Sequence, residues 1–109
     1  MELTVSREER FAVIAPAGRV TAPGVPQLKQ AIEEVIADGQ PRIVVDLART
    51  DFVDSSALGA LIGGLKSARS AGGDLRIANV TEPVRRVLSL TNLDRVLRDH
   101  PSVESAFDE

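Results

Sequence analysis

The sequence contains no cysteine, tryptophan or tyrosine, and only 3 of its 109 residues are phenylalanine. Without cysteine the chain can form no disulfide, no thiolate nucleophile and no cysteine-based metal site. The three aromatic rings, Phe11, Phe52 and Phe107, offer little surface for stacking on nucleic-acid bases or sugars. The hydrophobic core is therefore expected to consist of small aliphatic side chains.

An excess of positive charge is also lacking, because 13 basic residues face 16 acidic ones and the net charge is -3. This balance argues against binding to the phosphates of nucleic acid or to an anionic membrane. No stretch approaches the roughly 18 apolar residues of a membrane span, and the acidic, alternating N-terminus does not resemble a signal peptide. We expect a soluble, cytoplasmic protein without a nucleic-acid or membrane partner.

The first half of the chain predicts a hairpin, a helix and a strand. Leu3 and Val5 alternate with polar residues, as do Phe11 and Val13, which predicts two strands joined by a turn at residues 7–10, with a second break at residues 16–18. Apolar residues then recur every three or four positions over residues 22–38, which predicts an amphipathic helix. The β-branched run of residues 43–47 predicts a central strand covered on both faces.

The second half predicts two longer helices and two short strands. One helical face, made of Leu58, Leu61, Ile62, Leu65 and Ala68, ends at Gly72-Gly73. A strand resumes at Leu75 and Ile77, and a third helix runs from a Thr81 cap to the neighbourhood of Asn92. Val96 and Leu97 predict a last strand, and a brief helix is expected from Pro101 to Phe107.

This alternation of strands and helices with short connections predicts an α/β fold. The sheet is expected to be mixed and mostly parallel, with about four or five strands and with helices packed on it. One domain is expected over residues 1–109, because the chain is long enough for one modest core and shows no linker or repeat.

Three consecutive polar residues, Asp54, Ser55 and Ser56, are expected at the junction between the predicted central strand and the second helix. Loops at the carboxyl ends of parallel strands often form the sites of α/β folds. Asp and Ser are also preferred N-cap residues, so one of the three is expected to accept a hydrogen bond from a first-turn N–H. A cap needs only one such residue, which leaves at least one hydroxyl facing outward.

The helix that follows contains three glycines, Gly59, Gly63 and Gly64, each of which disfavours a helix by about 1 kcal/mol relative to alanine. On a helical wheel, a stripe of small residues runs away from Ser55: Ser56, Gly59, Ala60, Gly63 and Ser67. Such a stripe lets a partner's backbone approach closely or, if it faces the sheet, permits tight internal packing. The helix N-terminus would also favour a phosphate on Ser55.

Several segments of the chain together resemble a known family. They are GRVT at residues 18–21, VDL at 45–47, FVDSSALG at 52–59, AGG at 71–73, VRRVL at 84–88 and LDRV at 93–96. With them, the chain resembles a STAS domain, specifically a bacterial anti-sigma factor antagonist (anti-anti-sigma factor), over essentially its whole length. The Asp-Ser-Ser block is the specific part of the match. The family usually has glycine where this chain has Ala57. The methyl group of this alanine is expected to remove space at the contact surface.

The resemblance implies the STAS-domain fold and a partner-switching role in transcription regulation. In the family, the serine after the aspartate, here Ser55, is phosphorylated by an anti-sigma factor that is also a serine kinase. The unphosphorylated protein binds that anti-sigma factor and frees a sigma factor, and the family also implies a PP2C-type phosphatase as a partner. We expect a monomer when the protein is free. The implied partner-binding residues are Asp54, Ser55, Ser56, Ala57, Gly59, Ala60 and Gly63.

Two other interpretations remain open. A hydrolase would use Ser55 as nucleophile with Asp54 and the single histidine, His100, although the sequence lacks a GxSxG elbow. Alternatively, STAS domains serve as phosphorylation-independent assembly modules, such as the small STAS subunit of bacterial lipid-transport ABC systems or components of stress-signalling complexes.

The remaining features predict neither an enzyme nor a cofactor site. No GxxxxGK[ST] stretch is present, so any ATP and magnesium should belong to the kinase partner, and we expect no catalytic residue, cofactor or metal in this chain. Arg85 and Arg86 are expected on a solvated helix face. Lys66 and Arg69 are candidate contacts for an acidic partner surface.

Overall fold

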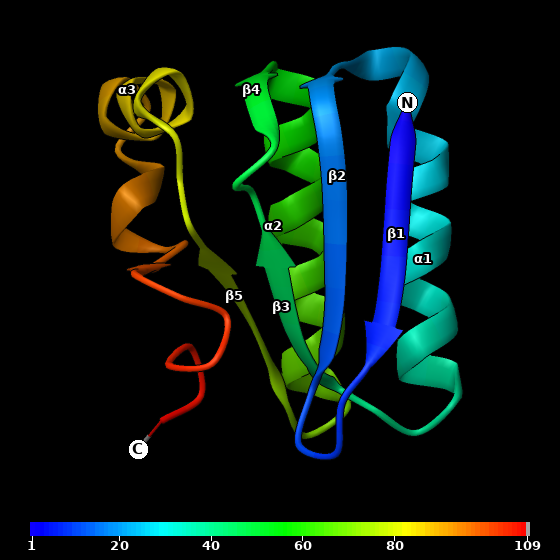
Figure 1. Cartoon of the computed structure of the whole chain (residues 1–109). Helices are drawn as coiled ribbons and strands as arrows, with labels where there is room; N and C mark the ends of the chain where they lie inside the picture. The colour runs from blue at the N-terminus through cyan, green and yellow to red at the C-terminus, as the bar shows by residue number, and fades with distance from the viewer. Residues whose placement is uncertain (109) are drawn as a thin grey trace.

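The computed structural model describes residues 1–108, in which strands and helices alternate along the chain (Figure 1). The elements, with η denoting a 3-10 helix, are β1 (Glu2–Arg7), β2 (Ala12–Val20), η1 (Ala22–Gly24), α1 (Val25–Ala37), β3 (Arg42–Asp46), β4 (Thr50–Val53), α2 (Ser55–Ser70), β5 (Asp74–Ala78), α3 (Glu82–Leu90), η2 (Leu93–Arg95) and β6 (Asp99–His100).

The strands form one 6-stranded sheet in the order β1-β2-β3-β5-β6, with β4 paired to β2 outside this path. Only β1 is antiparallel to its neighbour, and the β2–β3, β2–β4, β3–β5 and β5–β6 pairs are parallel. The predicted α/β class and the mixed, mostly parallel sheet are confirmed. The sheet has more strands than expected because β4 is a separate strand rather than a continuation of the loop after β3.

The predicted break at residues 16–18 is wrong, because β2 continues without interruption to Val20. Pro16 and Gly18, which suggested a break, instead mark the region where β2 changes its neighbouring strand. β2 pairs with β3 at residues 12–14 and with β4 at residues 18–20, and Pro16, which has no N–H to donate, lies between the two segments. Gly18 adopts a φ of 83°, where the register with β4 shifts, and its N–H donates to the Arg49 carbonyl at 2.8 Å.

The helices α1 and α2 lie side by side on one face of the sheet (Figure 1). Between them and the sheet lies the main core, built of valine, leucine, isoleucine and alanine as the composition predicted. The predicted helix over residues 22–38 is confirmed in its main part, although its first turn is the 3-10 helix η1. The strand predicted at residues 43–47 is β3, which is central in the sheet.

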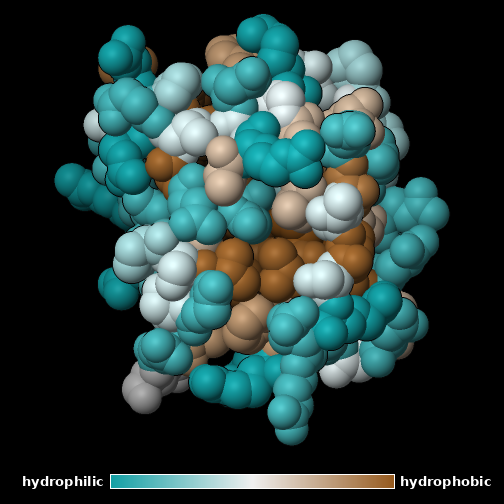
Figure 2. Space-filling model, viewed as in Figure 1, coloured by the Kyte–Doolittle hydropathy of each residue, from teal (hydrophilic) through white to brown (hydrophobic). Residues whose placement is uncertain are grey.

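The opposite face of the sheet carries a smaller core. Phe107 stacks on Phe11 with the ring centroids 6.1 Å apart, and both pack against Val44 and Ala78. The predicted helix from Pro101 to Phe107 is wrong, because this segment forms a series of turns. Figure 2 shows that hydrophobic side chains also gather on the middle of this face, which no helix covers.

Two further predictions need correction near the C-terminal edge. The last strand is β6 at Asp99 and His100, a few residues after the predicted Val96 and Leu97. Thr81 precedes α3 but makes no side-chain cap, because its hydroxyl donates instead to the carbonyl of Thr50 at 2.7 Å. No helix within residues 1–108 is long and apolar enough to cross a membrane.

Candidate functional site

Asp54 is the N-cap of α2, as expected for one residue of the polar block. Its Oδ1 accepts a hydrogen bond from the N–H of Ala57 at 2.9 Å, and its Oδ2 accepts one from the N–H of Ala22 at 3.0 Å. The same carboxylate therefore caps α2 and ties it to η1, which lies 32 residues earlier in the chain. With each oxygen bonded to the backbone, Asp54 has a structural role, and no hydrogen bond joins it to the hydroxyl of Ser55 within residues 1–108.

The position of this junction follows from the end of β4. Val53 pairs with Val20 at the last position of both strands, and the N–H of Asp54 donates to the Val20 carbonyl at 3.2 Å. The extended backbone of Asp54, with φ of -101°, then turns directly into the helix. The sequence placed the block after the central strand β3, whereas the structure places it after β4.

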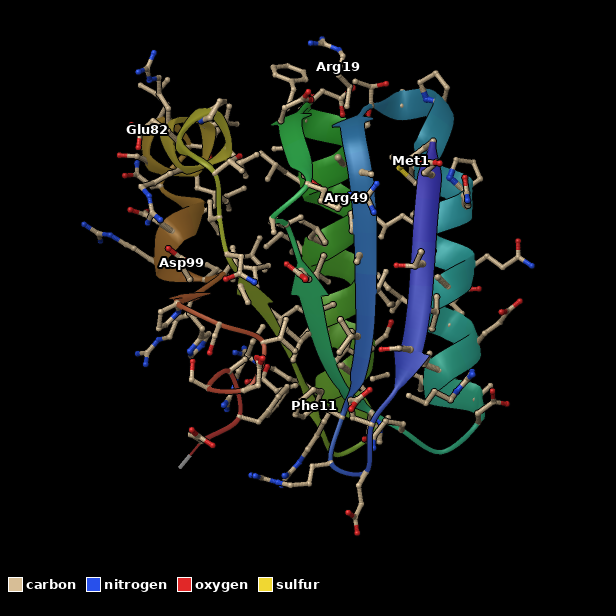
Figure 3. All side chains as sticks on the ribbon, viewed as in Figure 1. Met1, Phe11, Arg19, Arg49, Glu82 and Asp99 are labelled. Atoms are coloured by element: carbon tan, nitrogen blue, oxygen red, sulfur yellow. The ribbon has the colours of Figure 1, made fainter. Side chains whose placement is uncertain are left out.

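Ser55 and Ser56 begin α2 with exposed side chains. Within residues 1–108 neither hydroxyl takes part in a hydrogen bond. The chain turns from β4 into α2 at the upper end of the sheet in Figure 3, where Arg19 is labelled. Both hydroxyls are thus accessible to a second protein, and the N–H groups of the first helical turn lie beside them.

The three glycines of α2 divide between surface and core. Gly59 and Gly63 are exposed, and a Cβ added at either would meet nothing within 4 Å. Gly64 instead permits internal packing, because a Cβ there would lie 2.8 Å from Cδ1 of Ile32 on α1. Each of the two interpretations of the glycines therefore describes part of the helix.

Ala57 and Ala60, two of the predicted contact residues, lie beneath the surface, with only 0% and 2% of their respective surfaces exposed. Both pack in the main core. The methyl group of Ala57 therefore does not crowd the outer surface, contrary to the expectation from its replacement of glycine. The candidate surface consists of Asp54, Ser55, Ser56, Gly59 and Gly63.

A shallow cavity of about 220 Å³ continues this surface between α1 and α2. Gly63 and Ser67 line it from α2, and Lys29 and Glu33 line it from α1. Gly63 thus belongs to both the exposed stripe and the groove. No sequence pattern indicates this groove, because it depends on how the two helices pack.

A Ser-Asp-His triad is not assembled. Ser55 is the first residue of α2, and Arg69 lies in the last turn of that helix, about 21 Å from Ser55 along the helix axis. His100 lines a cavity together with Arg69, at this far end of the helix. Asp54 bonds backbone N–H groups rather than an imidazole. The geometry of the described residues gives no support to the hydrolase interpretation.

Two of the four basic residues singled out in the sequence form ion pairs within the chain. Arg85 pairs with Asp99 at 2.6 Å and so ties α3 to β6, while Arg86 is exposed on α3 as predicted. Arg69 pairs with Asp74 at 3.1 Å, far from Ser55 along α2. Lys66 is exposed on the same helix.

Sequence reasoning missed one pair beside the site. The guanidinium carbon of Arg19 lies 4.3 Å from the ring centroid of Phe52, and these two residues face each other across the β2–β4 pair. Arg19 is exposed and Phe52 is half-buried. Both residues belong to the segments that carry the family resemblance. Their membership in these segments could have indicated that they lie near the site.

The exposed serines at the start of α2 suit recognition by a second protein. Within residues 1–108, no group of three or more His, Asp or Glu side chains could hold a metal ion. An exposed serine at a helix N-terminus can accept a phosphate with little disturbance, because the helix dipole and the free N–H groups favour an anion there. A modified Ser55 would present that charge to an approaching partner.

Comparison with known proteins agrees with this fold and identifies related families. The family described as "Mlab, STAS domain" matches residues 3–99. A Thermotoga maritima protein provisionally named an anti-sigma factor antagonist is 36% identical over 81 residues, which cover 74% of this chain and 72% of that protein.

Solved structures share the fold. The crystal structure of a provisionally assigned anti-sigma factor antagonist from Thermotoga maritima has a TM-score of 0.88 at 27% identity, covering 97% of this chain and 92% of that one. SpoIIAA in its unphosphorylated form has a TM-score of 0.74 at 21% identity, covering 95% of this chain and 92% of that one. The phosphorylated form of SpoIIAA, from Bacillus, has a TM-score of 0.73 at 22% identity, covering 95% and 96%.

Proposed function

Because the chain belongs to the STAS domain family, among the anti-sigma factor antagonists, we propose that it binds an anti-sigma factor through the surface around Ser55 and thereby frees a sigma factor. Phosphorylation of Ser55 by that anti-sigma factor, acting as a serine kinase, ends the interaction. The observation that carries this proposal is the exposed Ser55 hydroxyl at the start of α2, which has no hydrogen-bond partner among residues 1–108. A PP2C-type phosphatase would restore the binding form, and the pathway belongs in the cytoplasm.

The switch can be explained by electrostatics. Phosphorylation adds a charge of about -1.5 to -2 next to the carboxylate of Asp54. Within the fold, the N-terminus of α2 offsets part of the repulsion, so the domain remains folded. At an interface fitted to a neutral hydroxyl, the same dianion must lose water without a matched cation, which costs several kcal/mol. Since 1.4 kcal/mol is about a tenfold change in affinity, the partner is released.

The two SpoIIAA structures support the idea that phosphorylation leaves this fold intact. This chain resembles the unphosphorylated and phosphorylated forms equally well, with TM-scores of 0.74 and 0.73. The difference between binding and release therefore need not involve refolding. A change of charge on the surface is sufficient.

The proposal is tested by the affinity for a candidate anti-sigma factor kinase encoded near the gene, measured by surface plasmon resonance. Ser55→Ala is expected to bind as tightly as the wild type, and Ser55→Asp about tenfold more weakly or worse. Ser89→Asp is the matched control, because it adds the same charge to an exposed serine of α3 and should bind normally. Equal affinities of Ser55→Ala and Ser55→Asp would contradict the switch.

A second candidate function is a phosphorylation-independent assembly module. The matching family is described as "Mlab, STAS domain", and we propose on this ground the small STAS subunit of a lipid-transport ABC system as the alternative. In that case Ser55→Asp and Ser55→Ala would assemble equally well with a transporter partner, and no kinase would modify Ser55.

A further inference from the structure

A cluster of charged residues lies at the opposite end of α2 from Ser55. A cavity of about 600 Å³ opens there, between the last turn of α2, the start of β5 and residues 95–100. Asp99, labelled in Figure 3, marks the strand β6 at its edge. Four of the lining residues are arginines: Arg69, Arg76, Arg95 and Arg98. A basic cavity is unexpected in a chain with a net charge of -3.

Part of this positive charge is neutralised locally. Asp74 pairs with Arg69 Nε through Oδ1 and with Arg76 Nε through Oδ2, each at 3.1 Å. Asp108 is the only other carboxylate among the described residues that line the cavity. Because Asp74 engages Arg69 and Arg76, the positive charge of the described lining rests mainly on Arg95 and Arg98.

Arg95 and Arg98 provide the free binding groups. Both are exposed, and within residues 1–108 neither side chain makes an ion pair or a hydrogen bond. Arg69 uses only its Nε toward Asp74, which leaves its terminal nitrogens able to donate. These groups require no rearrangement of existing contacts before they can bind an anion.

His100 is an independent sign of a ligand. It lines the same cavity, and its Nε2 is buried without a hydrogen-bond partner within the described chain. A buried polar group left without a hydrogen-bond partner destabilises the folded state. When Nε2 carries the proton, it can donate to an oxygen atom of a bound anion, which removes this destabilisation.

We propose that this cavity binds the phosphate group of a small molecule. Guanidinium groups match phosphate oxygens with paired N–H donors, and a cavity of about 600 Å³ lies within the range typical of small-molecule sites. Among the described residues, no Phe, Tyr or Trp side chain lines the cavity, so it lacks a large aromatic surface for a nucleobase. The fitting ligands are compact phosphates, either inorganic or esters of a small polar group, and the site functions apart from the Ser55 surface.

The test is a titration of the isotope-labelled protein with inorganic phosphate, inorganic diphosphate and glycerol phosphate, followed by backbone NMR shifts at constant ionic strength. Sodium chloride serves as the reference anion. We expect saturable shifts confined to the amides of residues 69–76 and 95–100. If glycerol phosphate binds more tightly than the inorganic ions, the ligand is an ester, and the reverse order identifies the free ion.

Substitutions then assign the residues. Arg98→Ala and Arg95→Ala should each weaken binding about tenfold, because each removes charge-assisted hydrogen bonds. Asp108→Asn should tighten binding, because it removes a competing negative charge. Arg86→Ala, on the exposed face of α3, makes the same change in net charge and should bind as the wild type does.

The outcomes decide the proposal in either direction. Saturable shifts that Arg98→Ala weakens and Arg86→Ala does not are the expected result. The absence of saturation by any of the three phosphates up to about 10 mM would overturn it, since an affinity weaker than that is no longer specific. Equal weakening by Arg86→Ala and Arg98→Ala would also overturn it, because binding would then depend only on net charge.

Discussion

Asp54 shows how one side chain serves two parts of the fold. Its role as a cap could be predicted from the sequence, because an aspartate before an apolar periodic segment is a common helix start. Its second hydrogen bond, to the N–H of Ala22, could not be predicted, since the two residues are 32 positions apart and meet only when β2 and β4 pair. The cap therefore also fixes η1 against the candidate site.

Asp54→Ala is expected to lower the free energy of unfolding by about 1–2 kcal/mol, because it leaves two backbone N–H groups without their acceptor. The measurement is urea denaturation followed by circular dichroism. Asp51→Ala, which changes an exposed aspartate of β4 by the same atoms, should alter the stability by less than about 0.5 kcal/mol. Equal losses in the two variants would show that Asp54 makes no special contribution.

Asp74 makes the stability depend on acidity. Burial raises the pKa of its carboxyl, but the hydrogen bonds from Arg76, Arg69 and the Leu75 N–H outweigh this effect, so the pKa lies below the ordinary value of 3.8. A group whose pKa is lower in the folded state stabilises the fold above its unfolded pKa. That contribution is lost as the pH falls through the folded pKa.

Asp74→Asn should therefore lower the free energy of unfolding at neutral pH by about 1 kcal/mol, because it weakens two partly exposed ion pairs. The difference should shrink below about pH 4 and vanish in stronger acid. Urea denaturation at a series of pH values measures it. A difference that stays constant from neutral pH into strong acid would contradict this role.

At the scale of the element, α2 combines a face that must fit the core with a face that remains open. The sequence predicted the helix and its apolar stripe, because the 3.6-residue period is strong. It did not show which glycine served which face. Gly64 meets α1 and β5, whereas Gly63, its neighbour in sequence, faces outward. The distinction depends on how α1 packs against α2, which a single-helix pattern does not contain.

This neighbouring pair gives a matched test. Gly64→Ala should destabilise the protein by about 1–3 kcal/mol, because its Cβ would lie 2.8 Å from Ile32 Cδ1. A Cβ at Gly63 has open space, so Gly63→Ala should raise the free energy of unfolding by up to about 1 kcal/mol through its higher helix propensity. The same substitution should weaken partner binding if the exposed stripe is the contact surface. Thermal unfolding gives the first comparison and surface plasmon resonance the second. A stable Gly63→Ala variant with unchanged affinity would remove the stripe from the interface.

At the scale of the whole molecule, the packing on one face of the sheet could be predicted from the sequence better than the packing on the other. The main core and the parallel strands follow from local patterns of apolar residues. The second face depends on distant contacts. Arg76 donates to the Ala106 carbonyl at 2.8 Å and lies over the ring of Phe107 at 4.4 Å, and these contacts hold the C-terminal turns. β4 was missed for a similar reason, since its four residues form a strand only beside β2.

Phe107→Ala should lower the free energy of unfolding by about 3 kcal/mol, because the ring is 3% exposed and fills the smaller core. Phe52→Ala is the matched control, since that ring is only half-buried, and it should cost clearly less. Chemical denaturation of both variants provides the comparison. If Phe52→Ala proved the more damaging, the C-terminal turns would contribute little to the fold.

Phosphorylation of Ser55 is tested by incubating the purified protein with the candidate anti-sigma factor kinase and ATP, and then measuring the intact mass and mapping the modified peptide. We expect the addition of one phosphate at Ser55, none on Ser55→Ala, and unchanged modification of Ser56→Ala. A protein that forms the complex but gains no phosphate, or gains it at another residue, would show that Ser55 is not the switch.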